Sequence, residues 1–222
     1  MSLMATTTDA FGDAVTRQTE QYLSAVRTCT ALLPPTLLRY GRNGFTDSVA
    51  ELVTSESNCD ERLCELRTTL GTAEPNYTDV YLNTGAIMEL FVLIDEIPNR
   101  AEQFLRELDA MRPPLDESAA DALTRMAALV TRGTRILTDT VADFVTDLVR
   151  SGEPAPVVET VDQVATLESS ADDIKYEVIT HAFDALSTAE AVVIRDLARS
   201  LDAAIDAAED AADQLLYVHA GY

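Results

Sequence analysis

The sequence predicts an all-α protein of two tandem, antiparallel three-helix bundles, with six long helices in total. Apolar residues recur at helical spacing in six long segments, proline and glycine stand at the breaks, and no stretch alternates as a strand would. Apolar residues make up 47% of the 222 residues, which is enough for a packed core. No apolar run approaches the roughly 18 residues of a membrane-spanning helix, so we expect no membrane insertion.

The six segments follow one another with short breaks. Helices are expected to end where proline or glycine interrupts the pattern, because proline lacks the amide hydrogen and glycine disfavours a helix interior. The breaks lie at Pro34-Pro35, Gly71, Pro113-Pro114 and Ser151-Gly152. The expected helices cover residues 9–33, 46–70, 77–110, 116–150, 156–186 and 187–217.

Two acidic motifs repeat in the same order on either side of Pro113-Pro114. The second helix of each half carries Glu-x-x-x-Asp, and the third carries Asp-x-x-x-(Asp/Asn)-x-x-Glu. Two coupled motifs in a fixed order are far more specific than a lone acidic pair. We therefore expect a first bundle at residues 9–112 and a second at residues 113–222. Residues 1–8 are expected to be a tag and disordered start, since Met1-Ser2-Leu3 resembles a cloning scar.

The charge of the chain is strongly acidic. Asp and Glu number 38 against 16 Lys and Arg, the net charge is −22, and Lys175 is the only lysine. Such a surface repels phosphate backbones, which argues against nucleic-acid binding. It resembles the surfaces of proteins from salt-accumulating halophiles, in which concentrated salt screens the repulsion. The acids are interleaved with apolar residues, which argues against a disordered acidic tail.

The carboxylates of the second half are predicted to converge between its last two helices. Residues four apart share one face of a helix. Glu168 and Asp206 lie equally far along the chain from the expected turn at Ser187, as do Asp172 and Asp202, so each pair should sit at one height in an antiparallel hairpin. Both sets lie on the same rotational side of their apolar stripes. The carboxylates expected in this groove are Glu168, Asp172, Asp202, Asp206 and Glu209.

The first half repeats this arrangement with two departures. Asn99 stands where the second half has Asp206, and Pro98 falls inside the helix, where it removes a hydrogen bond. The side chains expected to converge in this half are Glu56, Asp60, Asp95, Asn99 and Glu102. Because this set has one charge fewer and a proline, we expect it to be the weaker of the two sites.

Converging carboxylates repel one another unless a cation or protons intervene. Oxygen-only ligand sets suit hard cations, so the metal is expected to be Mg²⁺, Ca²⁺, Mn²⁺ or oxidised iron. The competing interpretation is a solvated acidic face, such as halophile surfaces carry throughout.

The motifs carry a family resemblance. In Glu168-Ser-Ser-Ala-Asp172-Asp173-Ile174 and Leu201-Asp202-Ala-Ala-Ile205-Asp206-Ala-Ala-Glu209-Asp210, the chain resembles the PhoU-like family of phosphate-uptake regulators. It is most similar to the branch of small cytoplasmic proteins associated with Pit-type phosphate transporters. The resemblance implies two three-helix bundles that bind multinuclear metal clusters on their surfaces. It also implies a cytoplasmic regulatory or accessory protein, not an enzyme, that docks on a phosphate transporter or a signalling kinase at the membrane face. A homodimer is left open.

Two other functions remain as alternatives. One is a helical scaffold or adaptor without metal. The other is a ferritin-like di-metal enzyme, which needs Glu-x-x-His motifs, but neither histidine has a glutamate three residues before it. His181 falls near the apolar stripe of its helix and is expected in the core.

Overall fold

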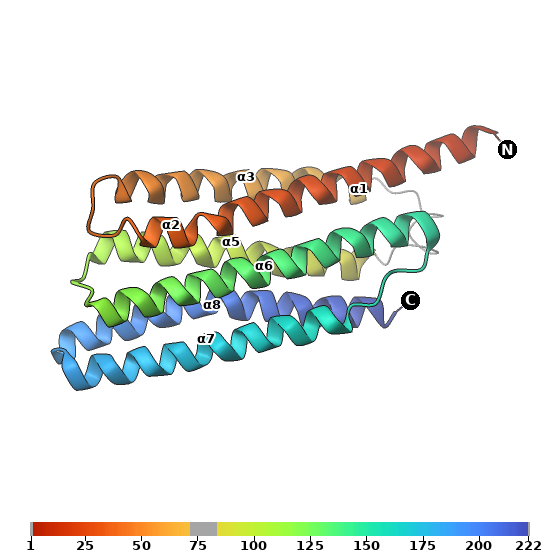
Figure 1. Cartoon of the computed structure of the whole chain (residues 1–222). Helices are drawn as coiled ribbons and strands as arrows, with labels where there is room; N and C mark the ends of the chain where they lie inside the picture. Colours follow the sequence, from red (N-terminus) through yellow and green to blue (C-terminus); the bar gives the residue numbers. More distant parts are fainter. Residues whose placement is uncertain (1, 72–83, 222) are drawn as a thin grey trace.

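The structure, a computed structural model, describes residues 2–71 and 84–221, and these residues contain helices and no strand (Figure 1). The predicted all-α class with six long helices is confirmed; one short helix, α2, is added within the described residues. The helices are α1 (Ser2–Ala31), α2 (Leu33–Leu37), α3 (Phe45–Gly71), α5 (Thr84–Met111), α6 (Glu117–Ser151), α7 (Val158–Ala185) and α8 (Thr188–His219).

Local caps mark both ends of α6 and the start of α8. The Asp116 carboxylate accepts a hydrogen bond of 2.8 Å from the amide of Ala119 at the start of α6. Gly152 ends α6 in the left-handed conformation, with φ of 74°, which glycine adopts without steric cost. Ser187 and Glu190 form a reciprocal capping box at the start of α8. Capping hydrogen bonds and a left-handed glycine therefore explain the helix ends that the sequence predicts at these residues.

Two predicted boundaries differ from the structure. Pro34 and Pro35 do not end helical structure but begin the short helix α2, because proline is tolerated in a first turn, whose amides lack partners anyway. The helix expected to begin at residue 9 begins at Ser2, while the tag and disordered start expected at residues 1–8 stays a prediction. No glycine or proline precedes Gly12, and extending a formed helix adds one hydrogen bond per residue. The expected helix start at residues 77–83 lies outside the described residues.

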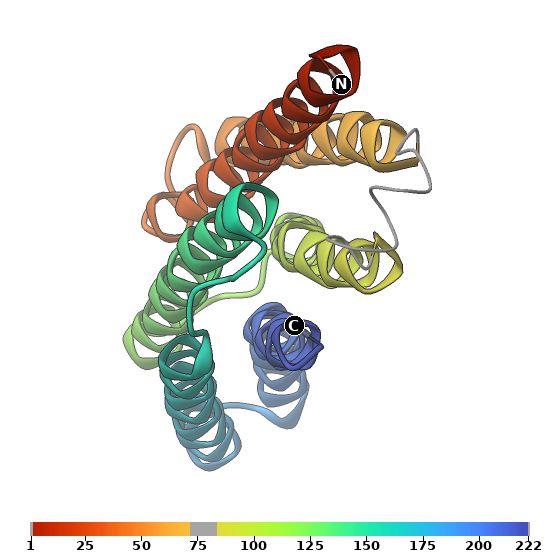
Figure 2. The ribbon, with the colours of Figure 1, turned by 90° about the vertical axis from the view of Figure 1, so that its right-hand side faces the viewer.

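The two halves of the chain pack side by side. In Figures 1 and 2, α1 and α3 lie on one side, α7 and α8 on the other, and α5 and α6 between them. Helix α5 packs along α8, and α1 along α6, and the contact of α5 with α8 is as extensive as that of α7 with α8 within the second half. The buried apolar side chains form one continuous core. The division of the chain into two bundles at residues 112–113 stays a prediction.

Helices α6 and α8 approach closely at one glycine. A Cβ atom on Gly133 would lie 2.9 Å from Cδ1 of Ile205 and 3.8 Å from Cδ1 of Leu167. Gly133 therefore lets α6 lie against the α7–α8 hairpin that carries the second set of acidic motifs. Within the described residues, no helix has an apolar stretch long enough to cross a bilayer.

Candidate functional site

Helices α7 and α8 bring the second-half carboxylates into electrostatic contact. We call these residues the second acidic cluster: Glu168 and Asp172 on α7, with Asp202, Asp206 and Glu209 on α8. Partial desolvation between the helices, followed by the charge of Asp202, raises the pKa of Asp206 to about 6, although this residue is exposed at its surface. Burial, followed by the charge of Glu168, also raises the pKa of Glu209. The carboxylates thus act on one another across the two helices, as a shared groove requires.

The only lysine of the chain lies inside this cluster. Lys175 stands one turn after Asp172 on α7, and its Nζ atom forms ion pairs with Oδ1 of Asp172 and Oδ2 of Asp202. The Lys175 side chain is 11% exposed and that of Asp202 is 7% exposed. The ammonium also lies 5.0 Å from the centre of the Tyr176 ring. The acidic motifs did not predict this role of Lys175, although a lone lysine three residues after Asp172 is a visible signal in the sequence.

Burial and pairing act in opposite directions on these charges. Burial by itself would lower the pKa of Lys175, but its hydrogen bonds to Asp172 and Asp202 outweigh that effect, and the pKa is raised. The pKa of Asp202 is raised, because burial pushes it upward by more than Lys175 pulls it down. Direct contact between the two groups favours the ionised pair, so we assign both as charged near neutral pH.

The first half of the chain also holds a set of interacting carboxylates. We call these residues the first acidic cluster: Glu56 and Asp60 on α3, with Asp95, Asn99 and Glu102 on α5. Glu56 is buried at 8% exposure. Burial, followed by the charges of Glu102 and Asp60, raises its pKa to about 7. Burial, followed by the charge of Asp60, raises the pKa of Asp95 to about 6. The negative charge of each carboxylate in this cluster therefore makes ionisation of its neighbours less favourable.

Neighbouring side chains orient and partly neutralise the first acidic cluster. The Tyr22 hydroxyl donates to Oδ1 of Asp95 at 3.3 Å and to the carbonyl of Phe91 at 3.2 Å. The Nε atom of Arg106 pairs with Glu102 at 2.6 Å. Pro98 lies within α5 without ending it. The cluster is therefore built on a continuous helix, with one buried hydroxyl that positions Asp95.

Comparisons with known proteins identify the fold but not a sequence family. No family model and no curated protein matches the chain. Two crystal structures from Shewanella oneidensis MR-1 do match. A PhoU-like phosphate regulatory protein is 15% identical with a TM-score of 0.79, and a PhoU-like protein is 15% identical with a TM-score of 0.80. Each match covers 94% of this chain and 100% of the other.

The chain has the PhoU-like fold. This agrees with the fold that the repeated motifs imply, and at 15% identity it is the fold alone that the likeness establishes.

The two acidic clusters of this PhoU-like fold differ in how well they suit a metal ion. Among residues 2–71 and 84–221, no three Asp, Glu, His or Cys side chains are grouped closely enough to hold one as they stand. In the second acidic cluster, the ammonium of Lys175 lies between Asp172 and Asp202, so these residues do not fit a metal. The first acidic cluster offers only oxygen donors, which is the chemistry that hard cations require.

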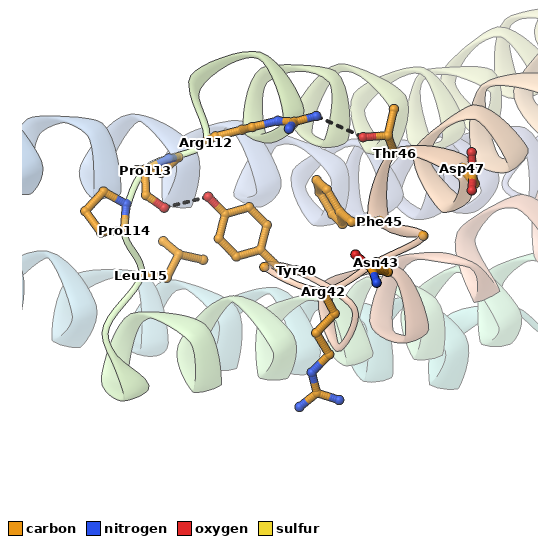
Figure 3. Close-up of a pocket in the computed structure, with 12 residues that line it drawn as sticks. Tyr40, Arg42, Asn43, Phe45, Thr46, Asp47, Arg112, Pro113, Pro114 and Leu115 are labelled. Atoms are coloured by element: carbon orange, nitrogen blue, oxygen red, sulfur yellow. Dashed lines mark hydrogen bonds between the residues drawn. The ribbon is translucent and has the colours of Figure 1, made fainter.

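A pocket lies at the junction of the two halves of the PhoU-like fold (Figure 3). It has a volume of about 700 Å³ and is lined by the loop between α2 and α3 and the linker between α5 and α6. The Tyr40 hydroxyl donates to the carbonyl of Pro113 at 2.5 Å, and Arg112 donates to the Thr46 hydroxyl at 2.9 Å. Arg42 points away from the other labelled side chains. The pocket is therefore a place where the loop is tied to the linker.

His181 lies apart from both clusters and is not in the core. Its Nε2 atom is 2.7 Å from Oδ2 of Asp116, and the side chain is 38% exposed. This hydrogen bond, followed by that from the amide of Ala119, lowers the pKa of Asp116. The expectation of a core histidine is wrong, because the side chain lies at the edge of its apolar stripe and reaches the N-cap of α6.

Proposed function

We propose that this protein regulates phosphate uptake or phosphate signalling. The observation that carries the proposal is the match in fold to a PhoU-like phosphate regulatory protein over 94% of this chain and the whole of the other. The repeated acidic motifs, which resemble those of the same family, support it independently, because the two acidic clusters lie on corresponding helices of the two halves.

The proposed mode of action is docking and not catalysis. A net charge of −22 favours partners with basic surfaces and disfavours nucleic acid. The resemblance to the Pit-associated branch points to the cytoplasmic face of a phosphate transporter, or to a signalling kinase, as the partner. The protein would act in the cytoplasm by changing the activity of that partner with phosphate supply.

Deletion of the gene tests the regulatory role. Uptake of radioactive phosphate is measured in phosphate-replete and phosphate-starved cells of the host, before and after deletion. The deletion should change the uptake rate or its response to starvation, and a plasmid copy should restore it. Equal uptake in both strains under both conditions would contradict the proposal.

We also propose that the first acidic cluster binds a hard cation such as Mn²⁺, Mg²⁺, Ca²⁺ or Fe³⁺. The support is its set of oxygen donors and the raised pKa values of Glu56 and Asp95, which show that these carboxyls gain from a compensating charge. Mn²⁺ should raise the melting temperature of the wild type and leave that of Glu56→Gln/Asp95→Asn unchanged. Glu117→Gln/Asp143→Asn, at two exposed acids of α6, is the matched control. An equal Mn²⁺ effect in all three proteins would rule the site out.

A further inference from the structure

We propose that Lys175 is the resident cation of the second acidic cluster, and that it takes the place a metal ion would otherwise occupy there. The assignment rests on the contacts of this lysine and is independent of the phosphate role. It also reverses the ranking expected from the sequence, in which the second half had the stronger metal site.

The ion pairs place the ammonium between the two helices of the cluster. Lys175 and Asp172 come from α7, and Asp202 comes from α8, so the charge joins both sides of the hairpin. The other oxygen of Asp202, Oδ1, is buried and has no hydrogen-bond partner among the described residues. Among the residues that the structure describes, Lys175 is the one cationic side chain paired with this carboxylate. A buried carboxylate without compensation is strongly unfavourable, so the lysine has a structural reason to stay.

A metal ion and the ammonium compete for the same oxygens. Mg²⁺ and Mn²⁺ require several carboxylate or water oxygens in direct contact, and the ammonium already binds one oxygen of each aspartate. A divalent ion beside the ammonium would also be repelled by its positive charge in a partly buried site. Within the second acidic cluster, Lys175 therefore offsets part of the charge of Asp172 and Asp202, the two aspartates that it contacts.

The first half lacks such a lysine. Glu56 and Asp60 correspond to Glu168 and Asp172 in the repeat, so the residue three places after Asp60 corresponds to Lys175. That residue is Leu63, an apolar side chain buried in the core at 1% exposure. The two halves therefore differ at one matching place of the repeat: an ammonium contacts two aspartates in the second half, and an apolar side chain stands there in the first.

Metal binding by variants tests the assignment, with Mn²⁺ as the probe. Bound Mn²⁺ per chain is measured by equilibrium dialysis and elemental analysis, and thermal melts are recorded with Mn²⁺ and with EDTA. The wild type and Asp202→Asn should bind equal amounts. Lys175→Met, which replaces the ammonium with an apolar group, should bind more Mn²⁺ than the wild type, and this gain should vanish in Lys175→Met/Asp202→Asn. Arg132→Met, which removes an exposed positive charge from α6, is the matched control and should gain nothing.

Two results would overturn the assignment. One is a loss of bound Mn²⁺ in Asp202→Asn relative to the wild type, which would place a metal in the second acidic cluster. The other is a folded Lys175→Met protein that binds no more Mn²⁺ than the wild type.

A second measurement needs no variant. Because the chain has one lysine, protein labelled with ¹³C-lysine gives a single set of side-chain signals in an NMR spectrum. Titration with diamagnetic Mg²⁺ should leave the Cε shift of Lys175 unchanged if the ammonium holds its place. A saturable shift of that signal would show that a cation displaces it, and would overturn the assignment even if Lys175→Met failed to fold.

Discussion

Replacement of Glu56 by glutamine is expected to stabilise the protein above neutral pH. Glu56 is buried beside Glu102 and Asp60, and its pKa rises from 4.5 to about 7. The folded protein therefore holds a proton that the unfolded chain releases between these values. The stability that comes from this proton is fully present below about pH 4.5 and is lost as the pH rises through about 7. Above pH 7 the folded state carries a buried, repelled charge that glutamine lacks.

The size of the effect follows from the shift in pKa. A rise from 4.5 to about 7 corresponds to about 3 kcal/mol at 1.36 kcal/mol per pKa unit, which is an upper limit. Asp60 is exposed, so solvent reaches the edge of the cluster and screens part of the repulsion. We expect Glu56→Gln to raise the free energy of unfolding by about 1–2 kcal/mol at pH 8. At pH 4.5, where glutamic acid is neutral, the difference should be near zero.

Urea denaturation followed by circular dichroism measures this difference. Wild type and Glu56→Gln are compared at pH 4.5 and pH 8, in EDTA and at one fixed KCl concentration. Glu51→Gln removes an exposed charge from the same helix and controls for net charge. Two results would contradict this expectation. One is a Glu56→Gln protein that is equally or less stable than the wild type at pH 8, and the other is an equal gain in the free energy of unfolding for Glu51→Gln.

Three further predictions concern salt, packing and one buried hydroxyl. The melting temperature should rise from low to multimolar KCl, because the net charge of −22 is self-repelling; a flat response would contradict the halophile interpretation. Gly133→Ala should destabilise, because its Cβ would lie 2.9 Å from Cδ1 of Ile205, which would have to shift within the buried core. Gly133→Ala/Ile205→Val removes that methyl group and should be more stable than Gly133→Ala by up to about 1 kcal/mol; a double variant no more stable than Gly133→Ala would reject this. Tyr22→Phe should lower the free energy of unfolding by about 1 kcal/mol, because it removes the hydrogen bonds of a buried hydroxyl to the Phe91 carbonyl and to Asp95; no loss of stability in urea denaturation would contradict a stabilising role for these bonds.

Helix positions followed from local signals in the sequence. Periodic apolar residues marked the long helices, and Asp116, Gly152 and Ser187 marked ends where the structure shows a cap or a left-handed turn. These signals succeed because a helix makes its hydrogen bonds within one segment. The signal of Pro34 and Pro35 was ambiguous, since proline both ends one helix and suits the first turn of the next.

The sequence by itself determined the helical class, the order of the helices and the heights at which carboxylates could meet across each hairpin. Only the tertiary structure decided what lies between those carboxylates. The bond from Lys175 to Asp202 joins α7 to α8, and that from Tyr22 to Asp95 joins α1 to α5. Such contacts depend on helix rotation and side-chain reach, which periodicity does not specify. Leu63 and Lys175 occupy matching places in the repeat, yet one is core and the other is a buried charge, because the surrounding helices set the environment of each.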